Sequence, residues 1–230
     1  MVQRVGVIGG GQLAWMMAAA VKKLGIELLI QTPQPTDPAV SIATQTVFAS
    51  IEDATATAKL ATYCDVITFE NEFVDLAALL QLEDQGVRFY PSLHSLAPLL
   101  DKYEQRCYLR DRGLPTPEFA ALDLSAPTKI PHPSHFPIVL KARRHGYDGQ
   151  GTFIIKNQRQ LEQVLTANPE RLNGYWLQEA FVPFDRELAV MAARSPSGEI
   201  VVYPVVETQQ VNQVCQRVFV TQEFGAAVVE

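Results

Sequence analysis

Short apolar runs alternate with amphipathic segments over the first hundred residues of the 230-residue chain. Residues 4–8 and 26–30 are apolar runs of strand length, and the segment between them opens with three glycines and ends at Gly25. Within that segment, apolar residues recur at helical spacing. A strand, a glycine turn, a helix and a second strand in this order predict the start of a doubly wound α/β domain. The apolar face of the predicted helix comprises Leu13, Met16, Met17, Ala20, Val21 and Leu24.

The same alternation continues to about residue 100. Ser92 is a capping residue for another helix, and a charged helix over 101–112 ends at Gly113. We therefore assign residues 1–100 to one α/β domain. The predicted strands cover residues 46–48, 65–69 and 87–89, and the predicted helices cover 53–63 and 74–85.

The next part of the chain, residues 101–185, has the pattern of a smaller α+β domain joined by the charged helix. Residues 137–140 form an apolar run that ends at Lys141, and residues 152–155 are its predicted hairpin partner. The other predicted elements of this antiparallel sheet domain are a linker at 114–117, a proline-rich loop at 125–137, a helix at 159–166 and a strand at 175–182.

Residues 186–230 are predicted to begin a third domain that is incomplete within these residues. The apolar runs at 188–193 and 200–206 are expected to pair as a hairpin across a Ser-Pro-Ser-Gly turn. A further strand at 211–220 and the start of a helix at 223–230 are expected to follow.

Charge and composition narrow the class of protein. A net charge of −6 and a pI near 5.3 argue against non-specific nucleic-acid binding, which needs a positive surface. There is no charged-then-apolar leader and no apolar run of membrane-spanning length, so we expect a cytoplasmic protein without a membrane partner. Cys64, Cys107 and Cys215 lack metal-ligand spacing and are expected to be reduced, half-buried thiols.

A glycine-rich segment connects the two strands of the hairpin in the smaller domain. Gly146, Gly149 and Gly151 allow backbone N–H groups to approach an anion, and Lys141 adds a positive charge on the preceding strand. The pattern favours a phosphate-binding loop. A flexible hairpin with basic surface residues is the alternative interpretation.

The first glycine turn also allows two interpretations. The spacing Gly9-x-Gly11-x-x-Ala14 approximates a dinucleotide-binding fingerprint, but the second strand ends in Gln31-Thr32 rather than in the acidic residue that binds a ribose. We therefore favour a single phosphate at the start of the helix.

Glu70 and Glu72 directly follow the predicted strand at 65–69. Ligands of open α/β sheets bind at the carboxyl ends of the strands, so either carboxylate is placed to face a ligand over the turn at residues 9–11. The other interpretation is that both are solvated loop residues that precede the helix at 74–85.

The order of these motifs resembles that of the ATP-grasp superfamily. A lysine, a glycine loop and two later glutamates follow one another as in its nucleotide site. Within this superfamily the chain looks like a 5-(carboxyamino)imidazole ribonucleotide synthetase, an ATP-dependent carboxylase of purine biosynthesis. The residues that carry the resemblance are 9–13, 68–72, Asp101, Lys102, Lys141, 146–151, Glu179 and Glu187.

The resemblance implies ATP as cosubstrate and magnesium held by a later segment, so that no metal ligand is predicted here. It also implies 5-aminoimidazole ribonucleotide and bicarbonate as substrates, joined through carboxyphosphate, and a homodimer of the full-length protein. Tyr147 and Asp148 are implied to act near the reacting groups. The implied substrate-binding residues are Gly11, Gln12, Leu13, Glu70 and Glu72, and the implied ATP-binding residues are Lys102, Lys141, Gly146, Tyr147, Asp148, Gly149, Gln150, Gly151, Thr152, Glu179, Ala180, Phe181, Val182, Glu187 and Gln210.

The resemblance also implies individual roles for the ATP-binding residues. Lys102 and Lys141 are implied to neutralise phosphates, residues 179–182 to bind adenine, and Glu187 to accept hydrogen bonds from the ribose hydroxyls. Three positions depart from the family pattern: Lys102 stands where arginine is usual, Gln150 where arginine or lysine is usual, and Gln210 where some members have a histidine.

Two other functions stay open. Another ATP-grasp enzyme of purine synthesis, such as the formate-dependent glycinamide ribonucleotide transformylase, would share the nucleotide site. A nucleotide-binding protein without turnover is the second, because roughly the last third of the family pattern is absent from these residues. On that ground we expect the 230 residues alone not to catalyse carboxylation.

Overall fold

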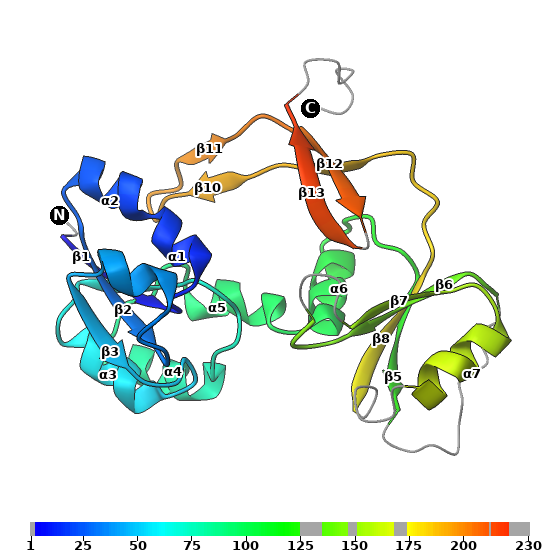
Figure 1. The fold of residues 1–230 in the computed structure, drawn as a ribbon, viewed down its shortest axis with the longest axis horizontal. Helices are drawn as coiled ribbons and strands as arrows, with labels where there is room; N and C mark the ends of the chain where they lie inside the picture. The colour runs from blue at the N-terminus through cyan, green and yellow to red at the C-terminus, as the bar shows by residue number, and fades with distance from the viewer. Residues whose placement is uncertain (1–2, 125–134, 147–150, 168–173, 212, 221–230) are drawn as a thin grey trace. The chain divides into compact units, whose positions relative to one another are not determined.

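The computed structural model describes residues 3–124, 135–146, 151–167, 174–211 and 213–220 (Figure 1). The chain divides into two compact units, Met1–Leu114 and Pro115–Glu230. The predicted division into three domains, with boundaries near residues 100 and 185, stays a prediction.

The first unit is built on a parallel sheet with the strand order β3-β2-β1-β4. The strand order reverses between β1 and β4, which makes the carboxyl ends of these two strands the topological switch point of the sheet. The strands are β1 (Arg4–Ile8), β2 (Glu27–Thr32), β3 (Gln45–Phe48) and β4 (Val66–Phe69), close to their predicted positions.

Helices cover both faces of this sheet, so the predicted doubly wound fold class is confirmed (Figure 1). Side chains alternate along β1: Val7 packs with α1 (Gln12–Met16) and α2 (Ala18–Leu24), whereas Ile8 packs with α3 (Ala54–Ala61) and α4 (Leu76–Asp84). Continuous apolar strands are what a sheet buried on both faces requires.

The helix predicted after the glycine turn is interrupted at Met17, which separates α1 from α2. The predicted apolar face is therefore wrong in part: Leu13, Met16 and Leu24 are 61%, 60% and 68% exposed, and Ala20 is exposed as well. The interruption shifts the helical phase, so that only Ala14, Met17 and Val21 of this segment pack on the sheet.

The first unit ends with two predicted helices; Ser92 is the predicted cap of the first, whereas Asp101, expected inside the second, instead caps it. Ser92 accepts a hydrogen bond from the Ser95 N–H at the start of α5 (Leu93–Leu96), and Asp101 caps α6 (Lys102–Asp111). The strand predicted at 87–89 is wrong, because only one bridge forms, between Ile67 and Phe89. Two 3-10 helices, η1 (Pro38–Ile42) and η2 (Ala97–Leu99), complete the unit.

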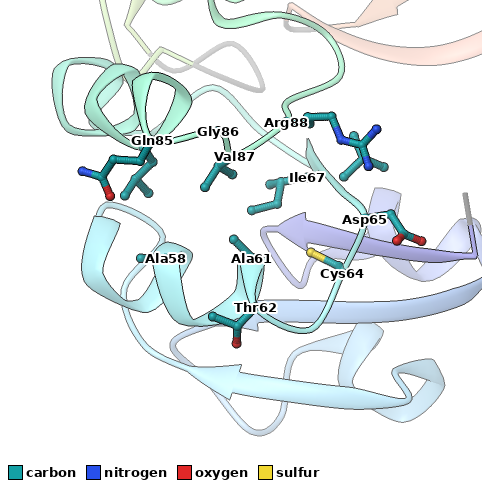
Figure 2. A pocket seen from close by; sticks show the side chains of 12 residues that line it. Ala58, Ala61, Thr62, Cys64, Asp65, Ile67, Gln85, Gly86, Val87 and Arg88 are labelled. Carbon is teal, nitrogen blue, oxygen red and sulfur yellow. The ribbon is translucent and has the colours of Figure 1, made fainter.

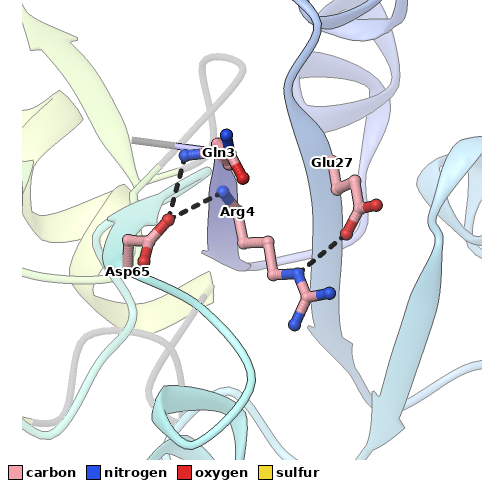
Figure 3. A network of polar contacts seen from close by, with 4 residues as sticks. All are labelled: Gln3, Arg4, Glu27 and Asp65. Atoms are coloured by element: carbon pink, nitrogen blue, oxygen red, sulfur yellow. Dashed lines mark hydrogen bonds and ion pairs between the residues drawn. The ribbon is translucent and has the colours of Figure 1, made fainter. Parts of the chain in front are cut away.

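A polar network ties the amino ends of the strands together (Figure 3). Asp65 Oδ2 accepts hydrogen bonds from the backbone N–H groups of Gln3 and Arg4, at 2.9 and 3.0 Å. Arg4 Nε in turn donates to Glu27 Oε2 at 2.9 Å. The bond from Gln3 and then that from Arg4 lower the pKa of the Asp65 carboxyl, since both favour its charged form.

The second unit contains an antiparallel sheet with the order β5-β8-β6-β7. The predicted hairpin around the glycine loop is confirmed, with Lys141 paired to Thr152 at the end next to the loop. The edge strand β5 was not predicted. The elements are β5 (Phe119–Asp123), β6 (Ile138–Ala142), β7 (Thr152–Ile155), α7 (Gln158–Ala167) and β8 (Tyr175–Ala180), and their core comprises Ile138, Leu140, Ile155, Leu161 and Trp176.

The remaining strands of the second unit form two small sheets rather than one long hairpin. The predicted turn at residues 195–198 is confirmed, but it joins only β10 to β11, and β9 pairs with β12 instead. Pro204, which has no N–H to donate, separates β11 from β12. The predicted helix at 223–230 lies outside the described residues. The strands are β9 (Glu187–Ala189), β10 (Ala192–Arg194), β11 (Ile200–Val202), β12 (Val206–Val211) and β13 (Val214–Phe219).

Other sequence expectations concern cysteines and membranes. All three cysteines are free thiols; Cys64 and Cys107 are half-buried as expected, whereas Cys215 is exposed. Within the described ranges, none of the helices has both the length and the apolar character needed to cross a membrane.

Candidate functional site

The glycine turn at residues 9–11 is wedged between two side chains at the switch point. A Cβ atom placed on Gly10 would lie 2.6 Å from Thr32 Oγ1, and one placed on Gly11 would lie 2.5 Å from Glu70 Oε1. Gly11 has φ −73°, a value that any residue adopts, so glycine is needed there for space. The turn is therefore built to bring a carboxylate close to bare backbone.

Two local contacts hold Glu70 over this turn. Its N–H donates to the carbonyl of Ile8 at 2.9 Å, which continues the ladder between β1 and β4. Asn71 Nδ2 donates to Glu70 Oε2 at 3.0 Å, while Asn71 Oδ1 accepts from the N–H of Phe73. Glu72 is exposed, and its side chain makes no hydrogen bond to the described residues. The structure thus brings Glu70, and not Glu72, to the turn.

The other predicted substrate residues of this turn begin α1. Gln12 and Leu13 follow Gly11 directly, and both side chains are exposed. On the opposite side of the turn, buried Thr32 donates a hydrogen bond to Asp37. Sequence reasoning included Asn71 in the 68–72 motif without giving it a role, and it missed Thr32 and Asp37, which only contacts around the turn connect to the site.

The side chain of Gln31, at the end of β2, is not available to bind a ribose. Its amide nitrogen donates to the carbonyls of Ser50 and Asp53, and its oxygen accepts from Thr57 Oγ1 at 2.8 Å. The side chain is fully buried, and these bonds satisfy it within the protein. This arrangement argues against a dinucleotide whose ribose would be bound at the end of β2.

In the second unit, Lys141 and Glu179 form an ion pair between neighbouring strands. Lys141 lies on β6 and Glu179 on β8, and the atoms Nζ and Oε2 are 2.6 Å apart. The Glu179 side chain is 4% exposed and that of Lys141 is 25% exposed. A desolvated carboxylate of this kind requires a cation or donors beside it, and a lysine whose end reaches solvent can also meet an anionic ligand.

The segment after Glu179 keeps one backbone donor available. The N–H of Ala180 donates to Glu118 and that of Phe181 to Pro137, at 2.8 and 3.3 Å. The N–H of Val182 makes no hydrogen bond within the described ranges. Of the predicted adenine-binding residues 180–182, Val182 alone thus offers an N–H to a ligand.

Glu187 and Gln210 are brought together on neighbouring strands, β9 and β12. Gln210 Nε2 donates to Glu187 Oε1 at 2.7 Å, and Thr208 Oγ1 lies 3.2 Å from the same oxygen. Two predicted nucleotide-binding residues therefore contact each other. Thr208 was missed, because nothing in the sequence distinguishes it from other strand threonines.

The ends of the predicted phosphate loop are closed by a backbone bond. The N–H of Ala142 donates to the carbonyl of Gly151 at 2.7 Å, and Gly151 has φ +76°, which favours glycine. Gly146 lies close by, with its Cα 3.7 Å from a Cβ placed on Gly151. The remaining loop residues of the prediction, Tyr147, Asp148, Gly149 and Gln150, lie outside the described residues.

Lys102 opens α6 in the first unit and is half-buried. Its predicted role beside Lys141 stays a prediction. For magnesium, no group of three His, Cys, Asp or Glu side chains in the described part of the chain is close enough to hold a metal ion.

A cavity of about 420 Å³ lies at the amino end of β4, and Figure 2 shows side chains that line it. Asp65 and Val66 line it at the amino end of β4, whereas Glu70 follows the carboxyl end of that strand. Cys64 also lines the cavity, and burial raises the pKa of its thiol. This cavity is separate from the glycine turn.

Comparison with known proteins identifies the class. Residues 107–230 match the ATP-grasp domain and residues 2–98 match the ribonucleotide synthetase preATP-grasp domain. The first match covers more than half of the chain, and the chain belongs to the ATP-grasp family. It is similar to the N5-carboxyaminoimidazole ribonucleotide synthase of Synechocystis, with 53% identity over 224 residues, which are 97% of this chain and 56% of that protein.

Solved structures agree with this relationship. A carboxyaminoimidazole ribonucleotide synthase from Aspergillus clavatus complexed with ATP has a TM-score of 0.86 and 28% identity, over 98% of this chain and 59% of its own. The synthase of the same organism with ADP and 5-aminoimidazole ribonucleotide has a TM-score of 0.82 and 26% identity, with the same coverage. The predicted resemblance is confirmed, and the chain spans little more than half the length of these relatives.

Proposed function

We propose that the intact protein carboxylates 5-aminoimidazole ribonucleotide with ATP and bicarbonate. The observation that carries the proposal is the Lys141–Glu179 pair between strands β6 and β8 of an ATP-grasp chain, with a backbone donor at Val182, three residues after Glu179. The similarity to N5-carboxyaminoimidazole ribonucleotide synthase supports the choice of substrate.

ATP is assigned to the second unit. Adenine offers both an acceptor nitrogen, suited to the N–H of Val182, and an exocyclic amine, suited to a carboxylate such as Glu179. Lys141, whose side chain is 25% exposed, then turns toward the phosphates that the loop over residues 146–152 covers. Glu187 accepts hydrogen bonds from the ribose hydroxyls. Lys102 is assigned as a second phosphate-neutralising cation.

The ribonucleotide substrate is assigned to the switch point of the first unit. Glu70 is held against the glycine turn, and a phosphate bound to the same turn would lie against its carboxylate. We therefore assign Glu70 to donors of the substrate, its hydroxyls or its amine. Gly11, Gln12 and Leu13 contact the same molecule from the turn and from α1.

The reaction that we assign to these two sites has two steps. An oxygen of bicarbonate attacks the γ-phosphorus, the bond to the β-phosphate breaks, and ADP leaves with the formation of carboxyphosphate. The substrate amine then attacks the carboxyl carbon, inorganic phosphate leaves, and the nitrogen loses a proton. Catalysis of this kind depends on positioning and on charge neutralisation, and lysines supply the second. Tyr147 and Asp148 are assigned to the loop side of the reacting groups, where water must be excluded.

The test is ADP release by the intact protein, with each substrate omitted in turn. We expect release to require both 5-aminoimidazole ribonucleotide and bicarbonate. Glu70→Ala should raise the KM for the ribonucleotide and leave that for ATP unchanged, whereas Glu72→Ala, the matched control, should behave as wild type. Release that instead requires glycinamide ribonucleotide and formate would replace the proposal with a transformylase, and ATP binding without release would replace it with a nucleotide-binding role.

The resemblance is also the basis for the expected homodimer and cytoplasmic location of the intact protein. Light scattering during size-exclusion chromatography and cell fractionation test these two expectations.

A further inference from the structure

Three polar side chains form a closed cluster on the paired strands β9 and β12. Thr208 is the direct register partner of Glu187, and Gln210 lies two residues further on the same face of β12. Gln210 Nε2 lies 2.7 Å from Glu187 Oε1 and 3.4 Å from Thr208 Oγ1, and Thr208 Oγ1 lies 3.2 Å from Glu187 Oε1. All three contacts are within hydrogen-bond distance.

The chemistry of these groups fixes the direction of each bond. A carboxylate only accepts, so Gln210 must turn its amide nitrogen, and Thr208 its hydroxyl hydrogen, toward Glu187. The second hydrogen of the Gln210 amide then reaches the lone pairs of Thr208 Oγ1. Gln210 donates to Oε1 of Glu187, and Thr208 Oγ1 lies closer to the same Oε1, at 3.2 Å, than to the backbone carbonyl oxygen of Glu187, at 3.5 Å. Oε2 makes no hydrogen bond with the described residues. The carboxylate therefore presents one anchored oxygen and one open oxygen.

We propose that Thr208 is a positioning residue that aims the open oxygen of Glu187 at a ribose hydroxyl, and that it thereby makes the site prefer ribonucleotides to deoxyribonucleotides. The inference rests on the proposed function, in which Glu187 binds the ribose of ATP. Thr208 itself does not contact the nucleotide in this role.

The position of Glu187 explains why such an anchor matters. Its side chain is exposed on a three-residue strand, and an exposed glutamate has several rotamers to lose when it binds a ligand. The two neutral donors restrict these rotamers beforehand and leave the negative charge intact. A hydroxyl bound by a charged acceptor gains more than one bound by a neutral acceptor.

The variants distinguish the effect of the Thr208 hydroxyl from the effect of the shape of its side chain. Thr208→Val keeps the branched side chain that suits a strand and removes the donor, whereas Thr208→Ser keeps the donor. Gln209→Ala, on the opposite face of β12, is the control for a change in this strand. Thr208→Ala provides a second variant without the hydroxyl in case the valine does not fold, and thermal unfolding checks each protein.

The measurement is calorimetric binding of ATP, 2′-deoxy-ATP and 3′-deoxy-ATP to the intact protein. Wild type should bind ATP more tightly than at least one deoxy analogue. Thr208→Val should weaken ATP about fivefold, the size of one hydrogen bond, and leave that analogue unchanged, so that the preference disappears. Thr208→Ser should restore the preference, and Gln209→Ala should not alter it.

Three results overturn the inference. Thr208→Val overturns it if it weakens all three nucleotides equally, which is the result expected of a purely structural residue, or if it changes none of them. A wild-type protein that binds ATP without any preference for its hydroxyls overturns it as well, while the proposed carboxylation stays intact. A wild-type protein that binds no ATP overturns the proposed function itself and removes the basis for the inference.

Discussion

Lys141 Nζ lies 2.6 Å from Glu179 Oε2, and the glutamate of this pair is almost fully buried. Lys141→Ala removes the cation beside a desolvated carboxylate. We expect it to lower the free energy of unfolding by about 3 kcal/mol, the cost of breaking such a pair. In the intact protein it should also weaken ATP binding by about 2–4 kcal/mol, because a charge beside the phosphates is lost.

Urea unfolding and calorimetric ATP binding measure the two effects separately. Lys156→Ala, which removes an exposed lysine just after β7, is the matched control and should change neither quantity. The double variant Lys141→Met/Glu179→Gln should recover part of the lost stability, because no unpaired charge is then buried. An unchanged ATP dissociation constant in Lys141→Ala would contradict the assignment of Lys141.

The contact of Gly11 with Glu70 gives a second prediction. Gly11→Ala is compatible with the backbone at φ −73°, but its Cβ would lie 2.5 Å from Glu70 Oε1. We expect this variant to displace the carboxylate and to lose about 1–3 kcal/mol of stability by overpacking. In the double variant Gly11→Ala/Glu70→Ala the clash is absent, so the two effects should not add. Additive losses in thermal unfolding would show that Glu70 does not restrict this position.

The sequence predicts the first unit well because its strands are continuous apolar runs bounded by glycines and caps. The sequence-based prediction fails where the hydrophobic pattern does not mark an element boundary. The segment around Met17 is apolar on all sides, so its break into two helices leaves no trace in the periodicity. β5 consists of Phe-Ala-Ala-Leu-Asp, which has no β-branched residue, and its strand conformation depends on pairing with β8. Between β12 and β13 the residue with positive φ, +66°, is Gln213 and not a glycine, so no glycine in the sequence indicates this turn.

The residues of the candidate site are likewise predictable only in part. Lys141, Glu179 and Glu187 are predictable because their types and order carry the resemblance to the ATP-grasp family. The role of Asn71, which lies in the 68–72 motif, and the presence of Thr208 in the site are not predictable, since each depends on a contact with a carboxylate. The choice between Glu70 and Glu72 could not be made from the sequence. It depends on which side chain lies against the glycine turn at about residue 10, roughly 60 residues earlier in the chain.

Burial of Cys64 gives a third prediction. Burial raises the pKa of its thiol, so the folded protein contains less thiolate at a given pH, and the thiolate is the reactive form. We expect iodoacetamide to modify Cys64 slowly at pH 7.5 and faster as the pH rises toward 9. Peptide mass spectrometry measures the modification, and the same protein unfolded in urea is the control. Equal rates in the folded and unfolded protein would contradict the prediction.

Asp65 gives a prediction on the pH dependence of stability. The backbone N–H groups of Gln3 and Arg4 lower the pKa of its carboxyl in the folded state (Figure 3). A carboxyl with a lowered folded pKa contributes stability above its unfolded pKa, about 3.9, and loses it as the pH falls through the folded value. Asp65→Asn keeps an oxygen that accepts both bonds but carries no charge. We therefore expect a lower midpoint of thermal unfolding at pH 7 and a smaller fall in that midpoint below pH 4.

The control for Asp65 is Asp84→Asn, which removes an exposed carboxylate near the end of α4 that makes no side-chain hydrogen bond to the described residues. Both variants change the net charge by the same amount, so a difference between their unfolding curves reports the two backbone bonds and not the overall charge. Scanning calorimetry between pH 3 and pH 7 should show the smaller acid loss in Asp65→Asn alone. Overlapping curves for the two variants would mean that the network at the amino ends of β1, β2 and β4 does not depend on the charge of Asp65.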